Sequence, residues 1–288
     1  MKRNLLLLLL ALYSCLFYAQ PKLDGEAPIR EKRGYDQRFV IDTAKVRVLY
    51  ALNAKDIKDE NTYIDLAKLE VGKRVRKYSS EFIALSDIEA MKWKKANNWK
   101  DNVPKTFWIG GRKETQEKWS ELVYSDYFVR GNQLTEYACM PLLLERNNGQ
   151  YTEPWPLMKW TLGKQHQTIL GHDCQNATCH FRGRDFEAWF ATDVPIKGGP
   201  WKFGGLPGCI LKVYDKDKIY VWEAVAIERG TFKISQYPDK LYPKSTRETI
   251  WKRQVKFSKD YWNCTGVIWL DPTRAPKGHK EFEALELE

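Results

Sequence analysis

The chain has 288 residues, of which 43% are hydrophobic, and 47 lysines and arginines against 37 aspartates and glutamates give it a formal net charge of +10. This length and apolar content can bury a substantial core, which excludes a chain without stable structure. The cations are scattered among acidic residues and form no basic stripe, which excludes a typical nucleic-acid interface. A basic surface of this kind favours acidic glycans, lipopolysaccharide or lipid headgroups as ligands.

The first residues have the order of charged, apolar and small residues that directs export. Two cations precede the apolar run Leu5–Leu10, and Ala19 provides a small residue at its exit. We therefore expect residues 1–19 to be a signal peptide. No later segment approaches the roughly 20 apolar residues of a membrane helix, so we expect no transmembrane segment. Attachment of a lipid at Cys15 is the alternative, although Tyr13 fits the pattern before such a cysteine poorly.

Alternating apolar and polar residues predict strands in the first part of the chain. Residues 38–52 have this period, and residues 63–78 repeat it as a strand or hairpin with a solvated face. Ser86 and Glu89 form a helix-capping pair, which predicts a short helix over residues 86–96.

The middle of the chain has the pattern of successive hairpins. A Gly-Asn turn separates two β-rich runs, residues 122–130 and 134–144. Residues 185–190, 210–214 and 219–227 continue the alternation, with turn residues between them. This region predicts a β-meander.

The last part of the chain is aromatic and basic, with a helix start at Thr246. Residues 271–288 have few apolar side chains and many charges, and we expect them to be a disordered tail. All elements together predict a mainly β fold, with α+β as the alternative: a curved antiparallel meander or partly open barrel with one or two short helices. We expect a single domain, residues 20–270, because no linker-like run divides it.

A tight turn is expected at Leu206-Pro207-Gly208-Cys209. Proline second and glycine third suit a type II turn, because proline fixes φ and glycine accepts a positive φ. We interpret Gly205, Leu206, Pro207 and Gly208 as a structural turn, since the Gly-Lys-Ser/Thr of a phosphate-binding loop is absent.

Five short motifs follow one another within residues 169–215: Cys174-Gln175-Asn176-Ala177, Phe181-Arg182-Gly183-Arg184, Ala188-Trp189-Phe190, Gly199-Pro200-Trp201-Lys202-Phe203 and Gly205-Leu206-Pro207-Gly208-Cys209-Ile210. In this combination the chain resembles the GLPGLI family of secreted proteins from the Bacteroidota. The resemblance implies an exported protein of the periplasm or cell envelope, and it implies no particular reaction. It also implies that residues 86–165 are an insertion.

Charged and aromatic side chains within the motif region are candidates for ligand binding. Two arginines, Arg182 and Arg184, are expected to face the same side of a strand, where two guanidinium groups can bind a carboxylate or phosphate. Internal pairing with nearby aspartates is the alternative. The chain has 12 tryptophans, which can line a ligand site, although core packing is their commoner use. The binding candidates are Arg182, Arg184, Trp189, Asp193 and Trp201.

Five cysteines follow the signal peptide. Cys179 and Cys209 both stand where the resembled family has other residues, which suggests a disulfide between them; buried free thiols are the alternative. Histidines and cysteines crowd residues 166–180, but their spacings match no zinc motif. We therefore expect no metal site and no cofactor.

These observations predict an exported envelope protein that is not an enzyme. The main interpretation is a ligand-binding or transport-accessory domain for an amphipathic, glycan or anionic ligand, with a partner in outer-membrane transport and no catalytic residue. The alternative is a secreted hydrolase acting on glycans or peptides, with Asp193 or Glu187 in an acid–base pair.

Overall fold

The computed structural model describes residues 34–99, 121–141, 143–266 and 284–288. The expected signal peptide and the lipid-attachment alternative at Cys15 lie outside the described residues. Most of the expected tail, residues 271–288, also lies outside them. Among the described residues, no helix is long and apolar enough to cross a membrane.

The described chain is mainly β, as the sequence predicts. Its strands are β1 (Phe39–Leu52), β2 (Asp65–Gly72), β3 (Arg76–Ser80), β4 (Asp126–Arg130), β5 (Gln133–Ala138), β6 (Gly149–Pro154), β7 (Thr161–Ile169), β8 (His172–Phe181), β9 (Arg184–Ala191), β10 (Cys209–Asp215) and β11 (Val221–Gln236). Its helices are α2 (Glu81–Ala96), α3 (Glu121–Tyr124), α4 (Arg247–Lys259) and α5 (Tyr261–Thr265). Short 3-10 turns are η1 (Tyr35–Gln37), η2 (Glu60–Thr62), η4 (Glu145–Asn147) and η5 (Asp239–Leu241).

All strands belong to one 11-stranded sheet with the order β6-β5-β4-β3-β2-β1-β11-β10-β9-β8-β7. The pairings between neighbouring strands are antiparallel. The chain runs outward from β1 to the β6 edge, and then returns from the β7 edge to β11, which pairs with β1. The region 86–165, expected as an insertion, therefore supplies three strands of this sheet, β4 to β6.

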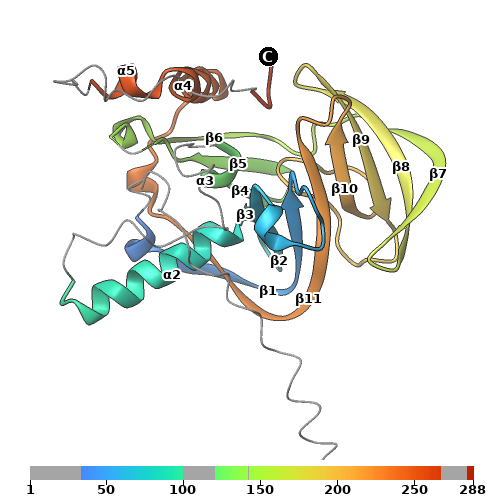
Figure 1. Ribbon diagram of the computed structural model, residues 1–288, viewed down its shortest axis with the longest axis horizontal. Coiled ribbons are helices and arrows are strands. Elements are labelled where there is room, and N and C mark those ends of the chain that lie inside the picture. Colours follow the sequence, from blue (N-terminus) through green and yellow to red (C-terminus); the bar gives the residue numbers. More distant parts are fainter. Residues whose placement is uncertain (1–33, 100–120, 142, 267–283) are drawn as a thin grey trace, which may run out of the picture.

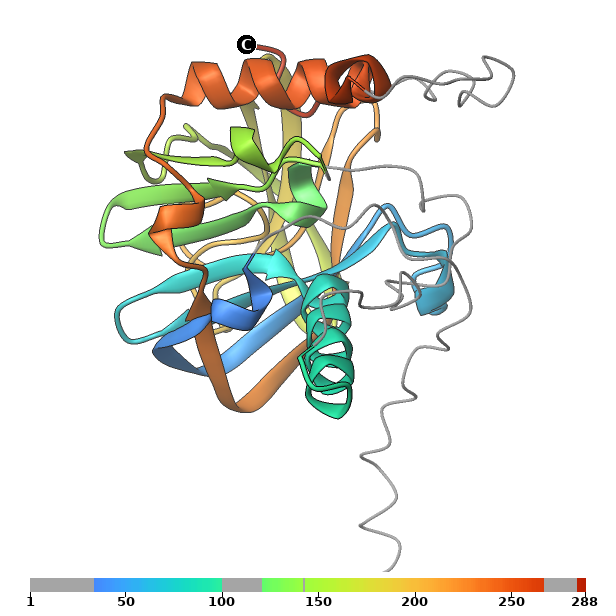
Figure 2. The same ribbon diagram turned by 90° about the vertical axis from the view of Figure 1, so that its left-hand side faces the viewer.

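The short connection between β6 and β7 requires the sheet to curve strongly. These strands lie at opposite edges of the sheet, yet only residues 155–160 join them. A flat sheet of this size would separate its edges by about 48 Å at ~4.8 Å per strand. The connecting residues can span at most about 25 Å. The sheet therefore folds round on itself as an open barrel, as Figures 1 and 2 show.

The helices α2 and α4 each begin at a side-chain cap. The sequence predicts the cap of α4 correctly and that of α2 at the wrong residue. The Thr246 side chain accepts a hydrogen bond from the Thr249 amide at the start of α4, as predicted. α2 instead begins after Ser80, whose hydroxyl accepts from the Ile83 amide, six residues before the predicted cap at Ser86. Both residues fit the capping rule, and the end of β3 decides which one is used. In Figure 2, α4 lies across one end of the sheet.

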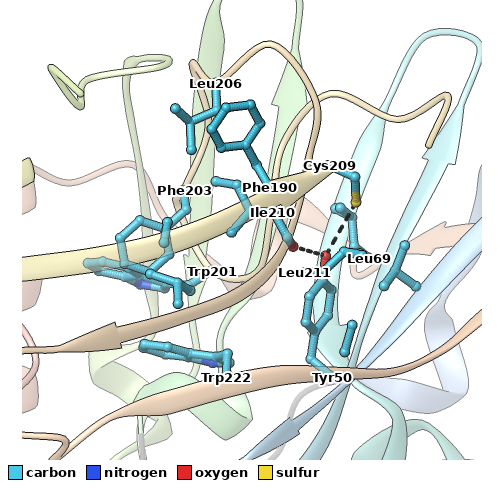
Figure 3. Packing of buried hydrophobic residues seen from close by; sticks show 14 of the residues in the cluster. Tyr50, Leu69, Phe190, Trp201, Phe203, Leu206, Cys209, Ile210, Leu211 and Trp222 are labelled. Atoms are coloured by element: carbon cyan, nitrogen blue, oxygen red, sulfur yellow. Dashed lines mark hydrogen bonds between the residues drawn. The ribbon is translucent and has the colours of Figure 1, made fainter. Parts of the chain in front are cut away.

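The interior of the curved sheet is filled by aromatic side chains from distant parts of the chain. Trp201 and Trp222 stack with ring centroids 6.3 Å apart, and Phe203 packs edge-on against Trp222. The Tyr50 hydroxyl, fully buried, donates a hydrogen bond of 2.9 Å to the Ile210 carbonyl (Figure 3). Core packing, the commoner use of tryptophan, therefore accounts for Trp201 and Trp222.

The turn before β10 has a different geometry from the one predicted. The positive φ belongs to Gly205, at 93°, whereas Gly208 is not among the positive-φ residues, so residues 206–209 do not form the expected type II turn. Gly208 is required for another reason: a Cβ there would lie 2.1 Å from the Ala191 carbonyl oxygen. Gly208 therefore allows two backbone segments to approach each other closely.

The predicted disulfide between Cys179 and Cys209 does not form. Both thiols are free and buried. Cys179 lies opposite Phe186 on β9, whereas Cys209 lies opposite Ala191, five residues along the same strand. This register separates the two cysteines by about 17 Å along β9, far beyond the ~6 Å between Cα atoms that a disulfide needs. The alternative interpretation, small buried thiols, describes both residues.

Candidate functional site

The loop Gly199–Gly204 enters the interior of the sheet and carries a lysine with it. A Cβ on Gly199 would lie 2.7 Å from the Ile210 Cβ, and one on Gly204 would lie 2.2 Å from the Trp155 ring. These glycines therefore let the loop pack tightly against the core. The Phe203 amide donates to the Pro200 carbonyl at 3.0 Å and closes the loop. As a result Lys202, between two core aromatics, has only 3% of its surface exposed.

The Lys202 ammonium group points at the two strands of the β5–β6 hairpin. It donates to the Tyr151 hydroxyl at 2.6 Å and lies 3.4 Å from Glu136 Oε2 and 3.6 Å from Glu153 Oε1. It also forms an ion pair with Glu286. We call Glu136, Tyr151, Glu153, Lys202 and Glu286 the Lys202 cluster.

The register of β5 and β6 brings the acidic members of the cluster together. Glu136 lies directly opposite Tyr151, and Glu153 follows two residues later on β6, so that it shares the face of Tyr151. The Tyr151 hydroxyl donates to Glu136 Oε2 at 2.8 Å. Gln254 of α4 donates to Glu136 Oε1 at 2.8 Å, which fixes the second oxygen of this carboxylate.

Two arginines surround the cluster on the side of Glu286. Arg182 contacts Glu153 Oε2 at 2.7 Å, and its Nε lies 3.8 Å from Glu286 Oε2. Arg247 of α4 contacts Glu286 Oε2 at 2.6 Å. Three cations thus face three carboxylates, and one of these carboxylates, Glu286, comes from residues 284–288. This balance is what allows so many charges to be buried together.

The same balance shifts the pKa values of the cluster. Burial alone would lower the pKa of Lys202, but Glu286, Glu136 and Glu153 together raise it above its ordinary value. For Glu286, burial raises the pKa, but the neighbouring cations, Lys202 first, bring it below its ordinary value.

Glu153 behaves differently from Glu286. Burial raises its pKa, and the attraction of Lys202 and Arg182 does not fully offset this effect. Its Oε1 atom is buried and has no hydrogen-bond partner among the described residues. Buried polar atoms are normally hydrogen-bonded, and Lys202 approaches this oxygen only to 3.6 Å, so it is a candidate for a hydrogen bond from a ligand or water.

The segment Ala284–Glu288 lies along the cluster and is held mainly through its backbone. Arg184 donates to the carbonyls of Ala284 and Leu285, at 2.5 and 2.9 Å. The Trp251 indole donates to the Glu286 carbonyl at 2.9 Å. In Figure 1 this segment lies between α4 and the end of the β8–β9 hairpin. It falls within the region that the sequence predicts to be a disordered tail, yet Leu285 is 2% exposed and part of the main core.

A small cavity remains beside the segment. It has a volume of about 20 Å³ and is bordered by Trp201, Trp251 and Glu286. This is room for about one water molecule. With the segment in place, this cavity has no space for a larger molecule.

Three of the five predicted binding residues meet at this site. Arg182, Arg184 and Trp201 all lie against the cluster or the Ala284–Glu288 segment. The two arginines do not share a strand face as predicted, because Arg182 and Gly183 form the β8–β9 turn, with φ of 52° and 77°. The internal pairing that the sequence left open occurs between Arg184 and Asp215, at 3.1 Å.

The other two predicted residues lie elsewhere. Asp193 is 61% exposed and pairs with His172 at 2.7 Å, and this hydrogen bond lowers its pKa. Trp189 borders a different pocket, beside Tyr214 and Lys212. Glu187 receives a contact from Asn176 on the sheet and is separate from the cluster. Among the described residues, no group of histidine, cysteine and acidic side chains could hold a metal ion.

Sequence reasoning missed the residues that form the centre of the site. The sequence places Lys202 only in a turn motif and Glu136 only in a predicted β-rich run, and it predicts no strand or role for Tyr151 and Glu153. The one available signal was a lysine placed between the core aromatics Trp201 and Phe203. Such a lysine must find buried acidic partners, but the sequence does not identify them.

One family profile and two solved structures are similar to parts of the chain. Residues 115–247 match the profile of a family described as "N-glycanase peptide, N-terminal domain". Two crystal structures of PNGF-II are similar to the chain at 16% and 15% identity, each with a TM-score of 0.43. They cover 74% of this chain, which in turn covers 34% and 33% of the solved chains and so spans about a third of their length. No curated protein sequence matches the chain.

This match corrects the resemblance to the GLPGLI family. The N-glycanase profile covers the whole motif region, residues 169–215. The motifs themselves are turn and strand signals: Gly205 provides a positive φ, Gly208 permits a close backbone approach, and Phe190 is buried in the core. Signals that follow from local geometry recur in unrelated families. The resemblance was therefore wrong.

The match also corrects the functional prediction. A ligand-binding or transport-accessory protein that is not an enzyme was expected, whereas the matched family takes its name from an enzyme, N-glycanase. The finding favours the alternative, a secreted hydrolase acting on glycans or peptides. The residues proposed for that alternative, Asp193 and Glu187, lie outside the Lys202 cluster.

Proposed function

We propose that the protein acts on N-glycosylated peptides and hydrolyses the amide bond that joins the glycan to the asparagine side chain. The observation that carries this proposal is the position of Glu136, Tyr151, Glu153 and Lys202. All four lie within residues 115–247, the part of the chain that matches the N-glycanase family, and their side chains meet in one buried cluster.

The reaction requires groups of the kinds that the cluster contains. Water adds to the side-chain carbonyl of the asparagine, the bond from this carbon to the glycan nitrogen breaks, and the nitrogen leaves with a proton. The peptide keeps an aspartate and the glycan leaves as a glycosylamine. A base must activate the water, and positive charge must stabilise the oxyanion that forms at the carbonyl.

We assign the base to Glu153. Its raised pKa brings it closer to neutral pH, and its Oε1 atom is buried without a hydrogen-bond partner among the described residues. Lys202, Arg182 and Arg247 are the groups for the developing negative charge, because all three converge on the place where the Glu286 carboxylate lies. Glu136 is a positioning residue, since it is held by Tyr151 and Gln254.

The expected signal peptide supports a location outside the cytoplasm, in the periplasm or cell envelope, which we propose as the place of action. Glycan and anionic ligands, expected from the basic charge, fit a glycopeptide substrate.

The test is incubation of the purified protein with an N-glycosylated peptide, followed by mass spectrometry of the peptide and the glycan. The proposal expects the asparagine to become aspartate and the whole glycan to be released. Cleavage within the glycan would instead leave a sugar on the asparagine and would contradict it. The assay is run on the wild type and on Glu286→Gln, because the Glu286 carboxylate occupies the cation site in the wild type.

Two further variants assign the base. Glu153→Gln keeps the shape of the side chain and removes the base, so release is expected to fall by at least about a hundredfold. Asp193→Asn is the matched control, since Asp193 is exposed and lies apart from the cluster. Equal loss in both variants, or loss only in Asp193→Asn, would refute the assignment of the cluster as the site.

A further inference from the structure

We propose that the segment Ala284–Glu288 is bound as a peptide ligand of its own chain, and that Glu286 holds the position of the carboxylate that glycan removal leaves on a peptide. The groove beneath it is then the binding site for the peptide part of the substrate. This inference rests on the proposed function for the identity of the ligand, and on the contacts of the segment for the site itself.

The groove recognises the segment chiefly through main-chain atoms. Arg184 binds the carbonyls of Ala284 and Leu285, and the Trp251 indole binds that of Glu286. The Leu287 amide donates to the Arg182 carbonyl at 2.9 Å. Each of the first four residues of the segment is thus held by its backbone. Main-chain recognition of this kind accepts peptides of different sequence.

Two side chains give the groove its preference. Leu285 enters the core that contains Trp201, and Glu286 enters the cluster of cations. Leu287 is 46% exposed and passes over Gly183, where a Cβ would lie 2.8 Å from the Leu287 Cβ. The site therefore takes an apolar residue followed by an acidic one, and the glycine allows the peptide to cross the β8–β9 turn closely.

The charges of the groove favour an anion. Without the segment, Lys202, Arg182 and Arg247 face only Glu136 and Glu153 among the described residues, so one positive charge is in excess around the buried Lys202. Glu286 supplies the missing negative charge. A peptide carboxylate formed by hydrolysis would do the same, whereas the neutral glycosylated asparagine would leave room for an oxyanion to form there.

The consequence is that the segment competes with substrate and product. A tethered segment acts at a high effective concentration, so the wild-type chain is expected to bind free peptide weakly. Weakening the contacts of Glu286 must then expose the site.

The test measures binding of a fluorescent peptide, Ala-Leu-Glu-Leu-Glu, to the full chain by polarisation. Glu286→Gln removes the charge-assisted contacts to Lys202 and Arg247, and we expect it to bind the peptide at least about tenfold more tightly than the wild type. The peptide with glutamine as its middle residue is expected to lose this gain. Glu288→Gln is the matched control, because it is the main-chain oxygen of Glu288 that meets Arg247. Equal binding by Glu286→Gln, Glu288→Gln and the wild type would overturn the inference.

A second measurement needs no variant. In the wild type, the Leu287 amide is expected to exchange with solvent faster than core amides such as that of Val213, and an excess of free peptide is expected to speed it further by occupying the groove. Exchange only at the rate of global unfolding, unchanged by peptide, would mean that the segment is a fixed part of the core and would overturn the inference.

The two proposals can fail separately. Peptide binding by Glu286→Gln without glycan release would refute the hydrolysis and leave the groove as a peptide site. Glycan release that is equal in the wild type and in Glu286→Gln would refute the competing segment and leave the proposed function.

Discussion

Replacement of Lys202 by methionine tests whether the cluster is held together by charge balance. Methionine has a similar length and no charge, so the change leaves Glu136, Glu153 and Glu286 buried with only the two arginines nearby. Lys202 is 3% exposed and its carboxylate partners are at most 10% exposed, so solvent screens these charges little. Removing one partner of a buried ion pair costs about 3–5 kcal/mol, and we expect a loss of this size at neutral pH.

The matched control is Lys212→Met. Lys212 pairs with Glu223 at 2.7 Å on the neighbouring strands β10 and β11, but both side chains are more than a quarter exposed, at 26% and 28%. An ion pair of this exposure contributes about 1 kcal/mol or less. The difference in unfolding free energy between the two variants therefore reports the effect of burial on the ion pair, because the residue type and the substitution are the same.

Urea unfolding at two pH values gives the measurement. Burial raises the pKa of Glu153, and Lys202 is the strongest of the charges that lower it, so its removal raises this folded-state pKa further above the unfolded value. The folded state then binds a proton more readily than the unfolded state, and the deficit of Lys202→Met is expected to shrink as the pH is lowered from about 7 towards 5, because Glu153 becomes neutral. A deficit no larger than that of Lys212→Met, or one that does not change with pH, would refute the charge-balance argument.

Three more outcomes are expected. The pKa of Glu286 is lowered in the folded protein, so its stabilising effect is present above its unfolded pKa of about 4.3 and is lost as the pH falls through the folded value. Acid unfolding curves of the wild type should show this loss. A weaker dependence of stability on pH in Glu286→Gln would confirm that Glu286 is its source. Gly208→Ala should destabilise the protein by about 2 kcal/mol or more, because the new Cβ would meet the Ala191 carbonyl oxygen at 2.1 Å, whereas Pro207→Ala should change the urea midpoint little; equal effects would contradict the close-approach argument. Burial raises the pKa of Cys179 and Cys209 to about 12 each and that of Cys174 to about 11. A thiol reagent at neutral pH should therefore label the half-buried Cys264 before these three cysteines, and rapid labelling of Cys209 in the folded protein would show that its site is open to solvent.

The strands were predictable because they depend on a short-range pattern. β1 and β10 coincide with alternating runs, since neighbouring side chains of a strand point to opposite faces whatever the rest of the chain does, and β11 begins in the run 219–227 but continues to Gln236. The cap of α4 at Thr246 was found for the same reason, because the cap and the amide it binds are three residues apart. The cap of α2 was misplaced, because two serines satisfied the same local rule.

The candidate site could not be predicted in this way. Arg182, Arg184 and Trp201 were selected from a motif region, and the structure brings them to one place for reasons that the motif does not contain. Asp193 was selected by the same reasoning, but it is exposed and pairs with His172 outside the cluster. The types of residues and their spacing along the chain do not determine which side chains face the interior of a curved sheet.

The amino-acid sequence by itself determined a basic, mainly β chain with curved antiparallel strands, because alternation, turn residues and helix caps act over a few residues. Only the tertiary structure decided that Lys202 meets Glu136 and Glu153, and that Glu286, from a region predicted to be disordered, completes their charge balance. Those contacts depend on strand register and on the closure that the short β6–β7 connection imposes on the sheet. A charge buried by folding needs partners that lie close to it in space, and the separation of residues along the chain does not predict which residues these are.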